Sequence, residues 1–407
     1  MKRSSPKRIG ILPLGGKDWI AGINYLQNIV RACNALPGSE RPKFYLICRY
    51  NEDVSELIRG FELQREDIRY FAYFSSDSRR QKLRSIAGCL RRGIWPRSFC
   101  HLVKHLKIEV FAPMMEIFGS EISVPWIGWI PDFQHKHLPE FFLEAELKKR
   151  DAYFRRLCDE ADHVIVSSRD GYEDLMRWFP VNERKVSVFP FPFLVEQSWY
   201  EGDPQAVVGQ FDLPDKYLMF PGQFWAHKNH QTLFEALRIL VREKNMEEIV
   251  LVCSGRQHDY RFPEHFESIK NFITEHKLET NIRLLGLIDR HEQIQLMRAA
   301  AAVINPSLFE GWCLMIEEAR SFGKHIFLSD LAVHREQDAP KAVYFDPHDA
   351  GALAEKLALC WAKLPSGVDR DAEEAARSRL KSSGREFAGR FIEIIEKTLN
   401  ARRPRWS

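Results

Sequence analysis

Two glutamates, Glu310 and Glu318, stand near a predicted helix start and could bind the hydroxyl groups of a phosphorylated ligand. They lie in AAVINPSLFEGWCLMIEEARSFGKHIFLSD, residues 301–330, whose pattern predicts a strand, a loop, a helix that Gly323 ends, and a second strand. Carboxylates accept strong hydrogen bonds from sugar or ribose hydroxyls. The spacing alone fits equally a Glu310 that caps the helix and a Glu318 on the surface.

The start of this helix is a candidate phosphate site. A helix N-terminus presents free backbone N–H groups and a positive dipole end, both of which favour a phosphate group. The N–H groups expected to face such a ligand are those that follow Glu310 and Gly311, namely Trp312, Cys313 and Leu314.

Lys228 is the third residue with clear chemical potential. It lies in YLMFPGQFWAHKNHQTLFEALRILV, residues 217–241, which predicts a strand, a loop and an amphipathic helix. A lysine after the carboxyl end of a strand can neutralise a leaving diphosphate as a point charge. A solvated lysine at a loop tip is the alternative. The Glu310 loop favours the functional interpretation, because both loops would open at one sheet edge.

Two further segments carry weaker signals. Gly16 and Gly22 follow the first predicted strand and would let the backbone approach a ligand, although their spacing does not match a dinucleotide fingerprint. Asp132, His135 and His137 follow the strand at 124–130 and could supply acid/base or hydroxyl-binding groups. With no further ligands nearby, the histidines do not predict a metal site.

The elements that position these residues alternate between short β-branched or aromatic runs and longer helical patterns, which predicts an α/β fold with doubly wound parallel sheets. The expected strands cover residues 8–14, 44–50, 108–113, 124–130, 163–168, 185–191, 217–222, 248–255, 281–287, 301–307, 325–330 and 342–347.

The domain plan follows from chain length, because 407 residues exceed what one hydrophobic core supports. We expect a Rossmann-like domain at 1–195, a linker at 196–214 where Pro, Gly and acidic residues break the periodicity, and a second Rossmann-like domain at 215–365. The family resemblance described below implies that the first is the acceptor domain and the second the donor domain. A charged helical segment at 366–407 is expected to pack back toward the N-terminal domain.

The composition, with 45% hydrophobic and 28% charged residues, is that of a globular protein. A net charge of +3 is too small to indicate nucleic acid, and the eight cysteines lack metal-ligand or disulfide spacing. No apolar run is long enough to span a membrane, so we expect a cytoplasmic protein. The basic stretch at 79–107 is expected to be a solvated face, with peripheral contact to an anionic membrane as the alternative.

The segment EGWCLMIEEA resembles the E-G-F-G-L-P-x-x-E-A motif of family 4 glycosyltransferases, which are retaining enzymes of the GT-B fold. The resemblance implies that Glu310 holds hydroxyls of the transferred sugar and Glu318 holds the ribose. GQFWAHKNH resembles the family's G-R-x-x-x-x-K-N loop, which places Lys228 on the diphosphate. GLIDRHEQIQLMRAAAAVINPS is similar to the stretch that lines the base pocket and implies that Ile288 contacts the base.

Three departures from the family pattern affect the site. Gln223 occupies the usual Arg position, so Arg256 is expected to share the diphosphate. Cys313 and Met315 replace the usual Gly and Pro. The family's acceptor-side histidine is absent in register, and His135 is expected to stand in for it.

The resemblance implies a retaining hexosyltransferase that uses a UDP- or GDP-sugar donor, a glycan or lipid-linked acceptor, no cofactor and no metal, in cell-surface polysaccharide or glycoconjugate synthesis. Lys228, Glu310 and His135 are its expected catalytic residues. The alternatives are a sugar phosphorylase or epimerase of the same architecture and a protein that binds nucleotide sugars without turnover. No nucleic acid partner is expected.

Overall fold

The computed structural model describes residues 6–15, 20–49, 63, 65–71, 97–118, 122–191, 193–380 and 383–402. The chain divides into two compact units. The first comprises Met1–Phe133, Lys148–Leu194 and Ser382–Ser407, and the second comprises Gln134–Leu147 and Val195–Lys381. These units differ from the expected domains in two places. Residues 134–147 and the helix before residue 381 both belong to the second unit.

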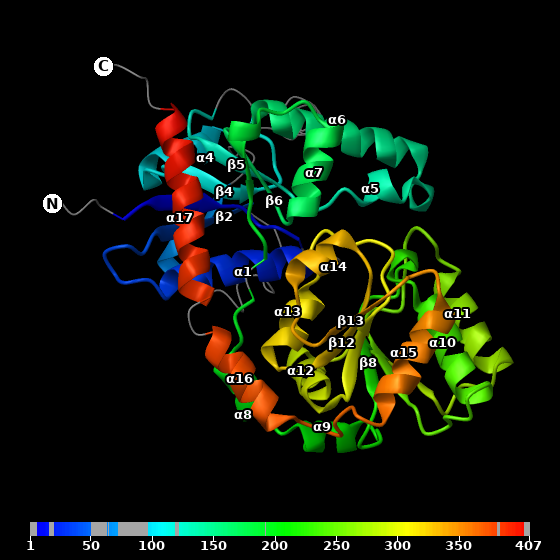
Figure 1. Cartoon of the computed structure of the whole chain (residues 1–407). Helices are drawn as coiled ribbons and strands as arrows, with labels where there is room; N and C mark the ends of the chain where they lie inside the picture. The colour runs from blue at the N-terminus through cyan, green and yellow to red at the C-terminus, as the bar shows by residue number, and fades with distance from the viewer. Residues whose placement is uncertain are drawn as a thin grey trace, which may run out of the picture. The chain divides into compact units, whose positions relative to one another are not determined.

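The first unit holds a 7-stranded parallel sheet in the order β3-β2-β1-β4-β5-β6-β7 (Figure 1). Its strands are β1 (Arg8–Ile11), β2 (Lys43–Arg49), β3 (Ile68–Phe71), β4 (Val110–Met114), β5 (Trp126–Ile130), β6 (His163–Val166) and β7 (Val186–Val188). Its described helices are α1 (Ile20–Asn34), α4 (Arg97–Leu106), α6 (Glu144–Glu160), of which the first residues lie in the second unit, α7 (Arg169–Trp178) and α17 (Ser383–Arg402). Strands β4, β5 and β6 are buried along their whole length, as in parallel sheets covered on both faces.

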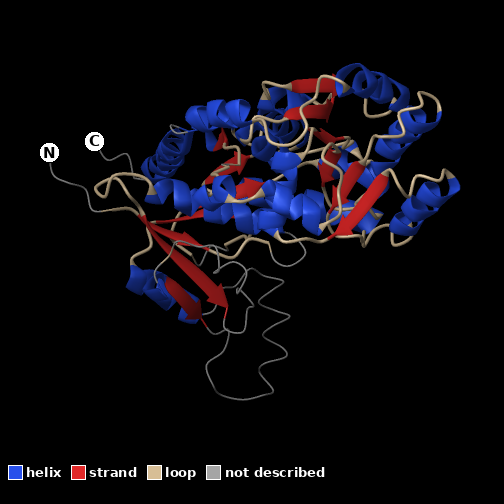
Figure 2. Cartoon of the chain, turned by 90° about the horizontal axis from the view of Figure 1, so that it is seen from below, coloured by secondary structure: helices blue, strands red, loops and turns tan. Residues whose placement is uncertain are grey.

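The second unit holds a 6-stranded parallel sheet in the order β10-β9-β8-β11-β12-β13, with helices beside its strands (Figure 2). Its strands are β8 (Leu218–Pro221), β9 (Leu251–Ser254), β10 (Ile282–Gly286), β11 (Ala302–Asn305), β12 (His325–Ser329) and β13 (Ala342–Phe345). Its main helices are α10 (His230–Arg242), α11 (His265–Glu275), α12 (Arg290–Ala299), α13 (Leu314–Ser321), α14 (Ala332–Gln337), α15 (Ala350–Trp361) and α16 (Arg370–Leu380). Every strand expected from the sequence is present, and the two doubly wound sheets confirm the predicted fold class.

The predicted linker contains two short helices, α8 (Gln197–Glu201) and α9 (Pro204–Gln210). Asp203 caps α9 by accepting hydrogen bonds from the N–H groups of Gln205 and Ala206, and Pro204 occupies the first turn. The Pro and Asp that suggested an irregular linker are therefore helix-start residues.

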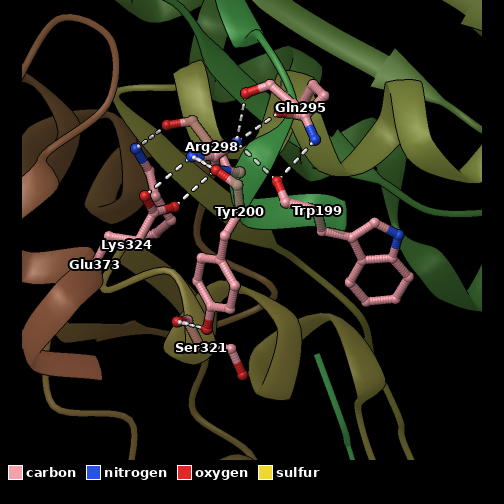
Figure 3. A network of polar contacts seen from close by, with 8 residues as sticks. Trp199, Tyr200, Gln295, Arg298, Ser321, Lys324 and Glu373 are labelled. Atoms are coloured by element: carbon pink, nitrogen blue, oxygen red, sulfur yellow. Dashed lines mark hydrogen bonds and ion pairs between the residues drawn. The ribbon is translucent and has the colours of Figure 1, made fainter. Parts of the chain in front are cut away.

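A buried arginine, Arg298 on α12, holds α8 and α16 in place (Figure 3). Its guanidinium donates to both carboxylate oxygens of Glu373 on α16, at 2.7 and 3.0 Å, and to the backbone carbonyl of Trp199 at 2.8 Å. Lys324 donates to the Arg298 carbonyl at 2.8 Å, and burial lowers the pKa of Lys324 to about 8. This arginine clamp holds α8 and α16 against α12 of the second unit.

Helix α17 belongs to the first unit, where aromatic side chains attach it. Phe387 lies 4.4 Å from Phe189 between ring centroids, and Phe391 lies 5.4 Å from the same ring. Phe391 also stacks on Phe44 of β2 at 6.3 Å. Helix α16, by contrast, packs in the second unit.

The basic stretch at 79–107 is described from residue 97 onward. Within α4 the apolar side chains Phe99, Val103 and Leu106 are buried in the core of the first unit, while Arg97, His101 and the other polar residues are exposed. Core packing therefore accounts for the amphipathic pattern of this helix. Among the described residues, no helix has both the length and the apolar character that a membrane span requires.

Two of the buried histidines, His163 in the first unit and His230 in the second, predict acid sensitivity. Burial lowers the pKa of His163 to about 4, and it lowers the pKa of His230 well below its ordinary value. His230 is fully buried, stacks on Phe224 at 4.2 Å, and neither of its ring nitrogens has a partner among the described residues. Both rings are therefore neutral in the folded protein.

Because the unfolded chain binds these protons near pH 6.5, stability is fully present above that pH and is lost as the pH falls below it, by up to about 1.4 kcal/mol per pH unit for each histidine. Thermal melts between pH 7.5 and pH 5.0 should show this loss. His230→Phe should reduce the acid-induced fall of the second unit's melting temperature. An unchanged fall in that variant would contradict the assignment.

Candidate functional site

The strand order of the second unit reverses between β8 and β11, and the loops that follow these two neighbouring strands carry Lys228 and Glu310. In open parallel sheets, the carboxyl ends of the strands at such a reversal form the usual ligand site, because the two following loops diverge there. The structure therefore brings together Lys228 and Glu310, whose loops the sequence predicted to open at one sheet edge.

Lys228 and Glu310 form an ion pair in which Nζ lies 2.6 Å from Oε1. The same oxygen accepts a hydrogen bond from Oγ of Ser307 at 2.7 Å and a longer one from Nδ2 of Asn305 at 3.4 Å. Burial alone would raise the pKa of Glu310, but the charge and hydrogen bond of Lys228 outweigh it and lower this pKa to about 2. Glu310 is therefore ionised throughout the physiological range.

Backbone contacts hold the two loops against each other. The N–H of Leu308 donates to the carbonyl of His227 at 2.8 Å. Asn229, in the left-handed conformation with φ 56°, donates from Nδ2 to the carbonyls of Pro306 and Pro347. The backbone of Lys228 thus lies between two anchored residues.

Helix α13 begins later than the sequence suggested, with Cys313 as its N-cap residue and without a side-chain cap. Glu310 therefore does not cap this helix. The N–H of Cys313 donates to Oε1 of Gln337 at 3.1 Å, and Nε2 of Gln337 donates to the Cys313 carbonyl at 2.9 Å. The expectation that this N–H is free for a phosphate is wrong, because a glutamine distant in sequence occupies it.

The remaining residues of the loop stay at the helix start. Gly311, Trp312 and Leu314 are half-buried, and Leu314 is the first residue of α13. Nε1 of Trp312 is a buried donor with no partner among the described residues. Gly323, at φ 64°, follows the last turn of α13 and ends the helix as expected.

Glu318 is buried, at 4% exposure, so it is not a surface residue. Its Oε1 accepts a hydrogen bond from the guanidinium of Arg290 at 2.5 Å, and that guanidinium lies 5.4 Å from the ring of Trp199. Ile288 is half-buried two residues before Arg290, in the loop between β10 and α12. Arg290 therefore links Glu318, the expected ribose ligand, to the end of the loop that carries Ile288, the expected base contact. The sequence did not indicate this contact.

Gln223 and Arg256 lie on adjacent loops after β8 and β9 and are half-buried. The N–H of Phe224 donates to the Arg256 carbonyl at 3.0 Å, so the two segments run side by side. Asp259 strengthens this contact, because its carboxylate accepts from the N–H of Ala226 at 2.9 Å. Arg256 thus lies on the loop next to Gln223, the position at which the family motif has a charged arginine.

His135 lies on α5 (Gln134–His137) and is only 1% exposed. A group that transfers protons must reach its substrate, so this burial does not suit the role expected for His135. The exposed His137 instead packs its ring 5.0 Å from that of Phe309, the neighbour of Glu310. Residues 134–147 belong to the same unit as Phe309, so the structure favours His137 over His135 beside the Glu310 loop.

The glycines of the first unit are only partly described. Gly16 lies outside the described residues, and Gly22 is buried in the first turn of α1. Gly15, the residue before Gly16, has φ 79°, a conformation that favours glycine.

The residues that the sequence analysis missed are those that orient the predicted ones. Ser307 and Asn305 hold Glu310, Gln337 holds Cys313, and Arg290 holds Glu318. Ser307 and Asn305 could have been found, since they lie within five residues of Glu310 on the same strand and loop. Gln337 and Arg290 could not, because only the fold brings them to their partners.

Comparisons with known proteins found similarity to glycosyltransferases. Residues 205–378 match the family model described as Glycosyl transferases group 1. The O-antigen chain mannosyltransferase RfbU of Salmonella typhimurium is 23% identical over 247 residues, which cover 60% of this chain and 64% of the relative. The D-inositol 3-phosphate glycosyltransferase of Corynebacterium glutamicum is 24% identical over 220 residues, 50% of this chain and 51% of the relative. The matches thus span between half and two thirds of these relatives.

Solved structures resemble the chain over nearly its whole length. Anabaena Alr3699/HepE, in complex with UDP and glucose, matches with a TM-score of 0.69 at 15% identity and covers 96% of this chain and 99% of that one. WaaG, a glycosyltransferase involved in lipopolysaccharide biosynthesis, matches with a TM-score of 0.59 at 12% identity and covers 97% of this chain and 100% of that one. At these identities the likeness concerns the fold, and it confirms the two-sheet GT-B fold.

Proposed function

We propose that this protein is a retaining glycosyltransferase of cell-surface polysaccharide or glycoconjugate synthesis, because residues 205–378 match the model of group 1 glycosyl transferases. It transfers a hexose from a UDP- or GDP-sugar to a glycan or lipid-linked acceptor. The names of the relatives support this proposal, since they include O-antigen chain mannosyltransferases. The neighbouring structure with UDP and glucose supports a nucleotide sugar as the donor class.

The observation that carries the proposal is the Lys228 and Glu310 pair at the strand-order reversal. Lys228 places a positive charge beside the start of α13, where the leaving diphosphate would gain stabilisation from both. Glu310, kept ionised by this lysine, accepts hydrogen bonds from sugar hydroxyls. Arg290 orients Glu318 toward the ribose side, and Arg256 supplies the charge that Gln223 lacks.

In the proposed reaction, the bond between the anomeric carbon and the diphosphate oxygen breaks, and the acceptor oxygen bonds to the same face of that carbon. The acceptor hydroxyl gives its proton to the departing phosphate oxygen. The protein's part is to position the two substrates and to screen the negative charge of the leaving group. No covalent intermediate with the protein is needed.

The donor site needs no metal in this proposal. The D-x-D sequence at Asp369 and Asp371 lies at the start of α16. Asp369 accepts a hydrogen bond from the N–H of Ala372 at 3.0 Å and pairs with Lys341 at 3.3 Å. These contacts give Asp369 a capping role, which supports donor binding without a D-x-D metal.

Donor binding is tested by a thermal-shift screen of UDP- and GDP-sugars. A matching donor at 100 times its Kd should add about 2.7 kcal/mol, which is about 5–10 °C for a unit of this size. Lys228→Ala should reduce the shift strongly. Lys244→Ala, which removes an exposed ion pair with Glu355, should not. If no nucleotide sugar raises the melting temperature of the native protein, donor binding is wrong.

Turnover separates the enzyme from a protein that only binds the donor. Release of UDP or GDP in the presence of a glycan or lipid-linked acceptor is expected. Because Gln223 stands where the related motif has an arginine, Gln223→Arg should raise the affinity for the donor. Donor binding without nucleotide release for any acceptor tested would favour the binding protein.

Peripheral membrane contact is proposed through the exposed basic residues of α4, and through electrostatics alone, since the apolar face of α4 is buried. Sedimentation with anionic vesicles at low salt tests this part. Binding should disappear as the salt concentration rises.

A further inference from the structure

Three side chains beside the proposed donor site have the chemistry of a transition-metal site. Glu310, Cys313 and His334 each offer one ligand atom, and these atoms lie within 4.8 Å of one another. The exposed fractions are 10% for the Glu310 side chain, 4% for Cys313 and 0% for His334. A carboxylate, a thiol and an imidazole are the ligands that Zn²⁺ uses in sites with three protein ligands.

His334 is already oriented as a metal ligand. Its Nδ1 lies 2.8 Å from the carbonyl oxygen of Ser329, and since a carbonyl only accepts, Nδ1 carries the proton. Nε2 therefore has a free electron pair, and it is a buried atom without a partner among the described residues. Metal-binding histidines commonly donate their other N–H to a backbone carbonyl in this way, which fixes the tautomer and the ring.

Glu310 retains one oxygen for an ion. Its hydrogen bonds with Lys228, Ser307 and Asn305 all end on Oε1. An ion can therefore bind Oε2 while the contacts that hold the side chain persist.

Cys313 supplies the soft ligand. Its Sγ lies 2.9 Å from Nδ2 of Asn305. Burial, together with the charge of Glu310, raises the pKa of the thiol to about 12, so the free protein holds the proton. A bound cation would displace this proton to solvent, because metal coordination deprotonates thiols. Cys313, which stands where the family motif usually has glycine, thus supplies a metal ligand that glycine lacks.

We propose that Glu310, Cys313 and His334 form a binding site for one thiophilic divalent cation such as Zn²⁺ or Co²⁺. Three protein ligands would leave the fourth coordination position of such an ion to a water molecule. A sugar or phosphate group is too large to reach ligands as buried as Cys313 and His334, whereas a single ion needs only small movements of three side chains.

The cation would inhibit the protein, and this consequence rests on the proposed function. An ion on Glu310 removes the carboxylate that would accept sugar hydroxyls, so donor and cation compete. Lys228 opposes the ion electrostatically, because its ammonium lies beside the same carboxylate. Lys228→Met should therefore weaken donor binding while it strengthens cation binding, a pair of opposite effects that separates the two proposals.

The test is a titration of the chelator-treated full chain with Co²⁺ alone, followed by absorption spectroscopy. One equivalent should produce a thiolate-to-cobalt charge-transfer band, and Zn²⁺ should abolish it. Cys313→Ser should lose the band, and His334→Asn should weaken binding by at least about tenfold. Cys253→Ala, which alters a buried thiol elsewhere in the same unit, should keep both the band and the affinity.

The proposal is overturned if native protein gives no such band, or if Cys313→Ser keeps it. Circular dichroism of each variant shows whether it is folded. If Cys313→Ser is unfolded, the cobalt affinity of His334→Asn tests the site instead. Nucleotide-sugar binding is measured on the same samples without metal. Donor binding without a cobalt band refutes only the cation site, and a cobalt band without donor binding refutes only the proposed function.

Discussion

Glu310→Gln is expected to lower kcat/KM for glycosyl transfer by about 10²- to 10³-fold and to destabilise the second unit by about 1–3 kcal/mol. The activity falls because the amide no longer carries the negative charge that orients sugar hydroxyls and holds Lys228 in place. The stability falls because the Lys228 ammonium, with a side chain 20% exposed, loses its charged partner. Steady-state kinetics by nucleotide release and thermal melts measure the two effects.

A matched control is Glu235→Gln on α10, which breaks an ion pair with Arg238 whose side chains are 35% and 24% exposed. Exposed pairs contribute at most about 1 kcal/mol, and this one lies outside the site, so activity should remain unchanged. If Glu310→Gln retains native kcat/KM, Glu310 has no part in catalysis. Since its pKa is about 2, the native pH profile should show no ionisation of Glu310 above about pH 4.

The sequence predicted the fold well because both sheets are built from short, buried apolar runs between amphipathic helices. The missed strand, β3, is the four-residue segment IRYF at the sheet edge, and only Phe71 in it is buried. An edge strand of this length has little apolar periodicity to reveal it. The short helices within the linker were not predicted, because Asp203 and Pro204 indicate a loop as readily as a helix start.

The candidate site was predictable where its residues follow strands and act through their own loops. Lys228 and Glu310 are of this kind, and parallel topology places them together. The different exposure of His135 and His137 could not be predicted, because it depends on the packing of residues 134–142 within the second unit. The same limit applies to Gln337 and Cys313, which meet only after α14 packs beside α13.

The arginine clamp gives the largest expected effect on stability. Arg298 is 4% exposed on its side chain, and Glu373 is 12% exposed. Arg298→Met removes the partner of a buried carboxylate and the donors to the Trp199, Tyr200 and Gly202 carbonyls. We expect a loss of about 3–5 kcal/mol, because an uncompensated buried charge costs more than the ion pair contributes. In thermal melts this is a fall of about 6–20 °C for the second unit.

The double variant Arg298→Met/Glu373→Leu distinguishes an unpaired charge from lost packing. Replacing both partners with apolar groups removes the buried charge, so part of the stability should return. Arg335→Met, which breaks an exposed pair with Asp330, is the control and should change the melting temperature little. If the double variant is as unstable as Arg298→Met, the backbone carbonyls of α8 rather than Glu373 dominate the clamp. Arg298 would then act mainly by holding α8 in place through the Trp199 and Tyr200 carbonyls.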